Sequence, residues 1–358
     1  MEDRQNSPQW WPVAFLFGFL AVLAIVVFVI ARPAPEQQAT PAEPATPAGQ
    51  AALSAEEFAQ LLAERQPSYS TMQLACPVEG TMLEVPNQDM DNRLGGVATD
   101  LMKIALGPPE EGIGRPSFEA QDWEMLLVTC PDCGATYHGI DLFNFGRGDA
   151  YSLADWDLSA LAPALAARSV EDWTVEERVL ARVLTQRAAG VESVELGFSA
   201  LQGAYAANFN TWYGRKVNVP SPAFYALAAA FFRDSLDESH TAMAPGTKAI
   251  TEMTLGEMYR LLGRREDAAQ VFADARESGG LDQYTLQVLE QLEGLATAGD
   301  SGLSRAEVSA LAPLSTGWYI DEMLPAINGH ISAHRDGWSD LNDPDDALAR
   351  ILAMLPAE

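Results

Sequence analysis

The stretch Thr129-Cys130-Pro131-Asp132-Cys133-Gly134 carries two of the three cysteines of this 358-residue chain in one tight turn. The third cysteine opens a related turn, Cys76-Pro77-Val78-Glu79-Gly80, in which Glu79 stands where the second cysteine would be. Turns of the type Cys-Pro-x-Cys-Gly point two side chains inward, and two such turns that face each other surround a metal ion with a tetrahedron of ligands. The pattern therefore predicts one metal site built from two turns far apart in the sequence.

The residue types at this site favour zinc. Cys76, Cys130 and Cys133 supply three soft thiolates, which suit Zn²⁺. The fourth ligand has two candidates: the carboxylate of Glu79, which occupies the expected position, and the imidazole of His138, five residues after Cys133. Cys3His is a common structural site, whereas a Cys3Glu set is unusual. Because losing one thiolate removes much of the affinity, a site without metal is a third alternative.

An unbroken uncharged run, VAFLFGFLAVLAIVVFVIA, fills residues 13–31 after an N-terminal tail at residues 1–12. Nineteen residues at about 1.5 Å each nearly match a hydrocarbon core of about 30 Å. Trp10 and Trp11 precede the run, where indole rings favour the membrane interface. A cleaved signal peptide is the alternative, but the run is too long and residues 30–32 lack the small-x-small pattern. We expect a single-pass helix in the cell membrane.

Residues 32–53 are rich in Pro and Ala, which predicts an extended spacer. The orientation of the anchor is not set by charge, because Arg4 and Arg32 flank it on opposite sides. A thiolate zinc site suits a reducing cytosol. A spacer of this kind is more typical of a domain held away from an outer face, and on that ground we expect the soluble part on the extracytoplasmic side.

A small β-rich head is predicted at residues 54–150. A capping box at Ser54-Ala55-Glu56-Glu57 starts a short helix. Strand-like stretches at 81–85 and 123–128 adjoin the two cysteine turns, and Gly-Ala-Thr-Tyr after the second turn indicates another strand. Residues 86–121 between them are too dense in turn residues for a long element. This region is poor in apolar residues, so a metal would be a useful staple.

Residues 151–358 are predicted to be helical hairpins. A capping box at Thr174-Val175-Glu176-Glu177 starts one helix. Hydrophobic periodicity and Gly- or Pro-containing breaks place further helices at 193–207, 221–236, 247–262, 265–278, 282–297, 304–312, 317–334 and 344–354. One segment, LGEMYRLLGRREDAAQVFADARESG, matches a tetratricopeptide repeat at Tyr259, Gly263, Ala268, Phe272 and Ala275. A plain helical bundle is the alternative. The expected fold class is thus mainly α.

Two other groups of potential metal ligands are better explained by helix chemistry. His330 and His334 lie one turn apart, but Ile331 replaces the Glu that a zinc protease needs after the first His. The acidic run DLNDPDD at 340–346 lacks the Gly and the closing Glu of a calcium loop. Asp343 as a helix N-cap with Pro344 at the first helical position accounts for it.

The two cysteine turns and the repeat together resemble an uncharacterised bacterial family with a Cys-Pro-x-Cys-Gly zinc-ribbon head followed by tetratricopeptide-like helices. The similarity covers roughly Leu74 to Ser278 and includes LLVTCPDCGATY around the second turn. It implies zinc ligands at Cys76, Cys130 and Cys133. The chain departs from the family pattern at Glu79, where that pattern has Cys. The family has no established activity, so the resemblance implies architecture rather than a reaction.

The net charge of −28 argues against binding nucleic acid, which needs a basic face. Helical repeats commonly bind a protein or peptide partner, so we expect a membrane-anchored, non-enzymatic adaptor. A tethered thiol-disulfide oxidoreductase using Cys130 and Cys133 is the first alternative. In such enzymes the first Cys normally starts a helix, whereas here the pair follows a predicted strand. A structural subunit of a membrane assembly is the second alternative.

Overall fold

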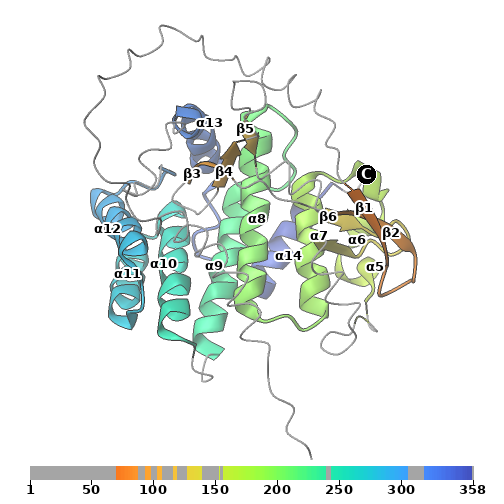
Figure 1. Cartoon of the computed structure of the whole chain (residues 1–358), viewed down its shortest axis with the longest axis horizontal. Helices are drawn as coiled ribbons and strands as arrows, with labels where there is room; N and C mark the ends of the chain where they lie inside the picture. Colours follow the sequence, from red (N-terminus) through yellow and green to blue (C-terminus); the bar gives the residue numbers. More distant parts are fainter. Residues whose placement is uncertain are drawn as a thin grey trace, which may run out of the picture. The chain divides into compact units, whose positions relative to one another are not determined.

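The computed structural model describes residues 70–87, 93–97, 103–106, 116–118, 127–138, 153, 156–238, 243–304 and 318–356. The predicted membrane helix at 13–31, the spacer at 32–53 and the short helix after Ser54 lie outside these residues. Among the helices that are described, none is long and apolar enough to cross a membrane. The described chain is mainly helical and carries small antiparallel sheets (Figure 1).

Each of the two cysteine turns connects the strands of a β-hairpin. Strand β1 (Ser70–Ala75) pairs with β2 (Met82–Asn87), and β6 (Leu127–Thr129) pairs with β7 (Thr136–His138). Each Cys-Pro-x-x-Gly segment is the turn of its hairpin. The strands expected after the first turn and on both sides of the second are confirmed in β2, β6 and β7, although residues 123–126 lie outside the described part. Strand β1 was not predicted.

A third small sheet lies within the segment between the two hairpins. It has the order β3 (Arg93–Val97), β4 (Lys103–Leu106) and β5 (Pro116–Phe118), all antiparallel. Pairing shifts register between Leu94 and Gly96, which indicates a bulge at the Gly-Gly pair. The expectation that this segment forms no long element is correct, but its short strands were not predicted, since none shows a clear two-residue periodicity.

Helices make up the rest of the described chain. They are α5 (Leu158–Leu161), α6 (Pro163–Ala166), the 3₁₀ helix η1 (Val170–Asp172), α7 (Val175–Ala188), α8 (Ser193–Trp212), α9 (Ser221–Glu238), α10 (Pro245–Leu261), α11 (Arg265–Ser278), α12 (Gln283–Ala298), α13 (Trp318–His334) and α14 (Pro344–Met354). The predicted helices are confirmed to within a few residues at their ends, except the one at 304–312. That segment, apart from Ser304, lies outside the described residues.

Helix α9 is the centre of the helical array. Every residue from Ala223 to Phe232 has an exposed fraction of 2% or less, because α9 packs against α8, α10, α13 and α14. A helix that is apolar on all sides must be enclosed in this way. Helix α8 approaches it closely through two glycines: a Cβ on Gly203 would lie 2.3 Å from the Phe224 ring, and one on Gly197 would lie 2.6 Å from the Phe232 ring.

The C-terminal helices fold back onto the array. Figure 1 shows α7 to α11 side by side in chain order, while α13 packs on α8 and α14 packs on α9. Arg187 of α7 also pairs with Asp345 of α14 at 2.5 Å. In an open stack of repeats each unit contacts only its neighbours. The return of α13 and α14 therefore closes this part of the array into a bundle.

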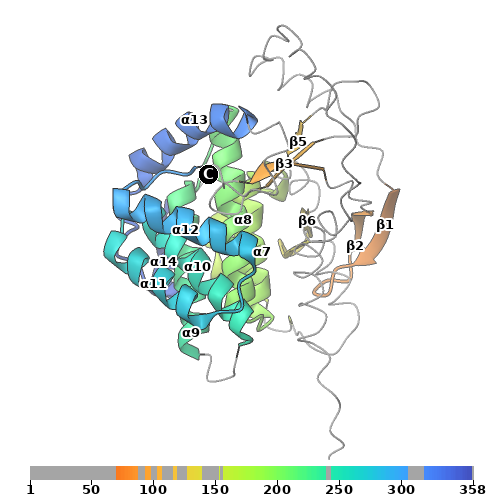
Figure 2. The same ribbon diagram turned by 60° about the vertical axis from the view of Figure 1, so that its left-hand side comes forward.

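The predicted repeat forms a helical hairpin of α10 and α11. The Phe272 ring of α11 lies against Gly256 of α10, where an added Cβ would sit 2.5 Å from it. Phe272, Ala268 and Ala275 are fully buried and form the inner stripe of α11. In Figures 1 and 2 α12 lies beside α11, and the contacts between the two helices agree. Helices α10 to α12 thus continue the array beyond α9.

Candidate metal centre

The two cysteine turns have the same backbone. In the first, the N–H of Gly80 donates to the carbonyl of Cys76 at 2.8 Å, and the N–H of Cys76 donates to the carbonyl of Thr81 at 2.8 Å. In the second, Gly134 and Cys130 make the matching bond at 2.9 Å, and Cys130 donates to Ala135 at 2.9 Å. The closing glycines have φ of 74° and 69°, a left-handed conformation that favours Gly. Glu79 is therefore the structural equivalent of Cys133.

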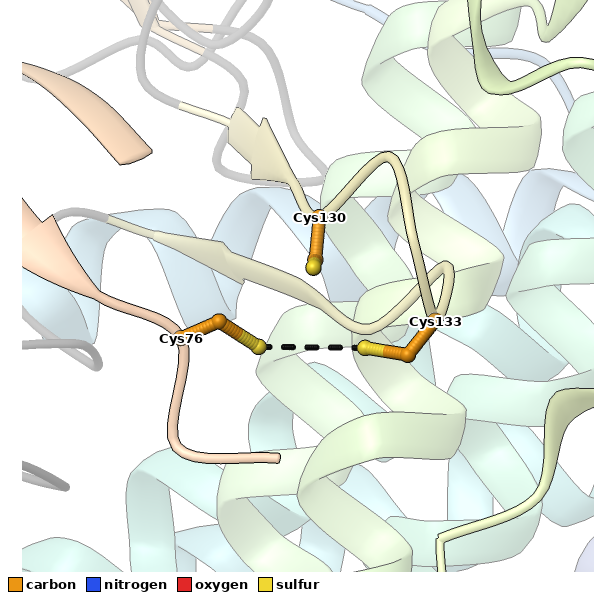
Figure 3. A group of neighbouring side chains, drawn as sticks. All are labelled: Cys76, Cys130 and Cys133. Carbon is orange, nitrogen blue, oxygen red and sulfur yellow. Dashed lines mark hydrogen bonds between the residues drawn. The ribbon is translucent and has the colours of Figure 1, made fainter. Parts of the chain in front are cut away.

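The three sulfur atoms converge between the turns (Figure 3). All three lie within 4.8 Å of one another, and the Sγ atoms of Cys76 and Cys133 are 3.7 Å apart. Cys130 is fully buried, Cys76 is 2% exposed and Cys133 is half-buried. The cysteines are free thiols rather than disulfides. These three residues, predicted from the sequence as ligands, are thus brought together and could hold a metal ion.

The other two predicted ligands are not part of this group. Glu79 is exposed, and its carboxylate does not lie within 4.8 Å of all three sulfurs. His138 is likewise outside the group. Adjacent side chains of a strand point to opposite faces, and Tyr137 already faces the thiols. His138, as the next residue of β7, therefore points to the other face.

Tyr137 is a member of the site that the sequence analysis missed. Its side chain is fully buried and its hydroxyl lies 3.5 Å from the Sγ of Cys76. Burial raises the pKa of Tyr137, and the neighbouring Cys76 raises it further, so the phenol keeps its proton. A neutral phenol is a hydrogen-bond donor to a thiolate. The available signal was the Thr-Tyr pair six and seven residues after Cys130, which continues the second turn into a strand.

The thiols of Cys76 and Cys133 are in hydrogen-bond contact at 3.7 Å. A hydrogen bond from Cys133 is the largest cause that lowers the pKa of Cys76, to about 5, and the bond to Tyr137 also contributes. The same contact raises the pKa of Cys133. The lowered pKa of Cys76 favours its thiolate, which is the form that binds metal.

The second turn is anchored on the helical array. The indole N–H of Trp156 donates to the carbonyl of Cys133 at 3.0 Å, and the N–H of Thr136 donates to the hydroxyl of Thr185 in α7 at 3.1 Å. A Cβ on Gly134 would lie 2.4 Å from Leu158 and 3.1 Å from Trp173. Neither aromatic residue was predicted to support the site, because each lies more than twenty residues further along the chain. The position of Cys130 and Cys133 is thus fixed by tertiary contacts.

The two turns are joined to each other outside the sulfur cluster. The hydroxyl of Thr81, directly after the first turn, donates to the carboxylate of Asp132 in the second. Strand β2 also packs against β6. A single apolar cluster that includes Cys76 and Cys130 continues through the helices to Leu355. The head and the helices therefore share a core within the described residues.

The distance between two of the three sulfur atoms is compatible with a shared metal ion. Two thiolates bound to one Zn²⁺ at about 2.3 Å lie about 3.8 Å apart at the tetrahedral angle. The 3.7 Å between Cys76 and Cys133 matches that edge. A dithiol redox pair is less well matched, because Cys130 ends strand β6 and is followed by a turn and β7 rather than by a helix.

The two groups that the sequence analysis attributed to helix chemistry lie far along the chain from this centre. The rings of His330 and His334 stack in α13 with centroids 4.3 Å apart, and burial lowers the pKa of His330 to about 4. The side chain of Asp343 accepts from the N–H of Asp345 at 2.7 Å and caps α14, with Pro344 at its first position. The predicted N-cap is confirmed.

No protein-family model, curated protein or solved structure matches this chain. The family suggested by the cysteine turns and the repeat is accordingly still a prediction. By its own geometry, the described chain is a mainly helical protein in which two hairpin turns present three converging cysteines as a candidate metal centre.

Proposed function

We propose that this protein is a membrane-tethered, non-enzymatic adaptor. In this proposal the run at 13–31 anchors the chain, the Pro/Ala-rich spacer at 32–53 holds the rest away from the membrane on its extracytoplasmic side, and the helices bind a protein or peptide partner. A zinc ion on Cys76, Cys130 and Cys133 staples the two hairpins of the head. The convergence of the three thiols and the 3.7 Å sulfur spacing support zinc.

A metal ion that joins the two hairpins would stabilise the head. The hairpins are short, with strands of six and three residues, and isolated two-stranded hairpins are marginal in water. A metal that joins residues 76 and 133 closes a long loop and ties the exposed first turn to the second turn, which is anchored on the helices. The zinc would therefore stabilise the head rather than perform chemistry.

The observation that carries the adaptor proposal is the one-sided burial of α11. Ala268, Phe272 and Ala275 face the array, while residues such as Gln270, Ala273 and Glu277 are exposed. Repeat hairpins use such exposed faces to bind partners. The surfaces of α8 and α9, in contrast, are covered by α13 and α14.

Site-specific photo-cross-linking tests this proposal in native membranes. A photoreactive residue in place of Ala273 on α11 should yield a discrete cross-linked product from the full chain. The matched control is Ala349, an exposed alanine on α14. Equal cross-linking at both positions, or none at Ala273, would contradict partner binding at α11. Retention of the full chain in membranes after an alkaline wash, lost on deletion of residues 13–31, tests the tether.

The thiol-disulfide oxidoreductase alternative has less support, for the structural reasons given for Cys130. It predicts that the full chain cycles a Cys130–Cys133 disulfide without metal. Stoichiometric zinc with unreactive thiols would exclude it. The structural-subunit alternative differs from an adaptor only in the permanence of its partner, so the same cross-linked product, found in constant stoichiometry in purified membranes, would favour it.

A further inference from the structure

The metal centre has three cysteines but four tetrahedral positions, and the equivalence of the two turns locates the fourth. The second turn presents the side chains of its first and fourth residues toward the centre, and the first turn has the same backbone with corresponding positions at Cys76 and Glu79. Cys76, Cys130 and Cys133 account for three of these places, and Glu79 stands at the last, with the same backbone hydrogen bonds around it as Cys133. The fourth corner therefore lies beside Glu79.

This corner is on the outer side of the centre. The first residues of the two turns, Cys76 and Cys130, are almost completely buried, while the fourth residue of the second turn, Cys133, is half-buried. Pro77, Glu79 and Gly80 of the first turn are all exposed. A Cβ on Gly80 would have no atom within 4 Å, in contrast to Gly134, which is covered by Leu158 and Trp173. Nothing among the described residues covers the fourth corner as the helices cover the second turn.

Among the residues that the structure describes, no fourth side chain joins the three sulfurs as a ligand for this corner. The Glu79 carboxylate lies outside the sulfur group, and His138 lies on the opposite face of β7 from Tyr137. Structural zinc sites are closed by four protein ligands, whereas sites with three protein ligands leave one position for a ligand from outside. The geometry thus corresponds to the second kind of site.

Charge determines which kind of ligand this position favours. Zn²⁺ with three thiolates carries one net negative charge, and the exposed carboxylates of Glu79 and Asp132 flank the centre. The whole chain carries a net charge of −28. An anionic ligand at the fourth position would be repelled by this negative charge, because like charges close together repel each other. A neutral nitrogen donor meets no such repulsion and is a common zinc ligand.

We propose that the metal centre is a three-cysteine site whose fourth position, beside Glu79, binds the imidazole of a histidine from outside the chain. This inference rests on the proposed metal centre and adds a ligand class to it. In an adaptor of this kind, the docking partner would supply the histidine that completes the metal site. The partner would then contact the head at the face where the first turn is exposed.

The test uses the full chain in detergent with Co²⁺ in place of zinc, because Co²⁺ absorption reports both the coordination number and the thiolate count. Imidazole, the probe, should shift the d–d bands saturably in the wild type. The variant Glu79→Ala should respond at least as strongly, because the competing carboxylate is gone. His138→Ala should behave as the wild type.

The matched control is the variant Glu79→Cys, in which a fourth thiolate at the exposed position occupies the fourth place on the metal. Its thiolate-to-cobalt bands should strengthen, and imidazole should leave its spectrum unchanged. If imidazole leaves the wild type unchanged while Glu79→Ala alters the spectrum without it, Glu79 is the fourth ligand and the inference is overturned. A response to 2-mercaptoethanol but not to imidazole would overturn the preference for a neutral donor. Failure of the chain to bind Co²⁺ or Zn²⁺ at all would overturn the metal centre itself, together with this inference.

Discussion

The two cysteine turns share one backbone and differ in what surrounds them. Both close with a left-handed glycine and the same pair of main-chain hydrogen bonds. The second turn is held by Trp156, Leu158 and Trp173 and carries two cysteines, while the first is exposed and carries one. The comparison shows that local sequence sets the shape of a turn, whereas tertiary contacts decide which turn is covered by the helical region and which is exposed.

The largest effect is expected from removing a buried sulfur. Cys130→Ser should weaken metal binding by more than about 100-fold, since loss of an outer partner of a ligand alone costs about 10- to 100-fold. Glu79→Ala should change it by less than about tenfold, because the carboxylate lies outside the sulfur group. Competition with a coloured chelator measures both affinities. Similar losses in the two variants would mean that Glu79 contributes as much to metal binding as Cys130.

The closing glycines provide the sharpest comparison of stability. Each Gly→Ala change carries a left-handed penalty of about 1–2 kcal/mol. Gly134→Ala also forces a Cβ to within 2.4 Å of Leu158, and overpacking adds about 1–3 kcal/mol. We expect a loss of about 2–5 kcal/mol for Gly134→Ala and about 1–2 kcal/mol for Gly80→Ala, measured by urea unfolding. Equal losses would show that the second turn is not anchored on the helices.

The hydrogen bond from Trp156 to the carbonyl of Cys133 is expected to contribute less to the free energy of unfolding than Gly134. Trp156→Phe keeps an aromatic ring but leaves that carbonyl without its donor, which should cost about 1–2 kcal/mol of unfolding free energy. Metal affinity should also fall, by up to about tenfold, because the turn that positions Cys133 loosens. A variant with reduced stability and unchanged metal affinity would show that Trp156 supports the helices but not the ligand.

The smallest effect is expected at the exposed link between the turns. Thr81→Val removes the hydroxyl that donates to Asp132 and should cost about 0.5–1.5 kcal/mol. The cost should be greater in the metal-free protein, where no ion joins the turns. A double variant with Asp132→Ala should be less destabilising than the sum of the two single changes. Strict additivity would show that the two side chains do not interact in solution.

Much of the fold follows from local sequence. The helices from α7 to α14 that are described begin and end within a few residues of the periodic patterns, and both turns form where Cys-Pro-x-x-Gly predicts them. Strand β1 and the sheet of β3, β4 and β5 were missed, because short strands gain their stability from their partners and show little pattern of their own. A helical hairpin of α10 and α11 forms where the sequence predicted a tetratricopeptide repeat, but the return of α13 and α14 onto α8 and α9 could not be predicted from periodicity.

The sequence by itself determined which three cysteines are the candidate metal ligands, the geometry of the turns that carry them and the positions of the helices. These depend on residues within a few positions of one another, through glycine conformation, capping and apolar spacing. Only the tertiary structure decided that Cys76 contacts Cys133, 57 residues away, that Tyr137 faces the thiols and that Glu79 does not. Such contacts depend on how hairpins and helices pack in three dimensions, and no local pattern encodes that packing.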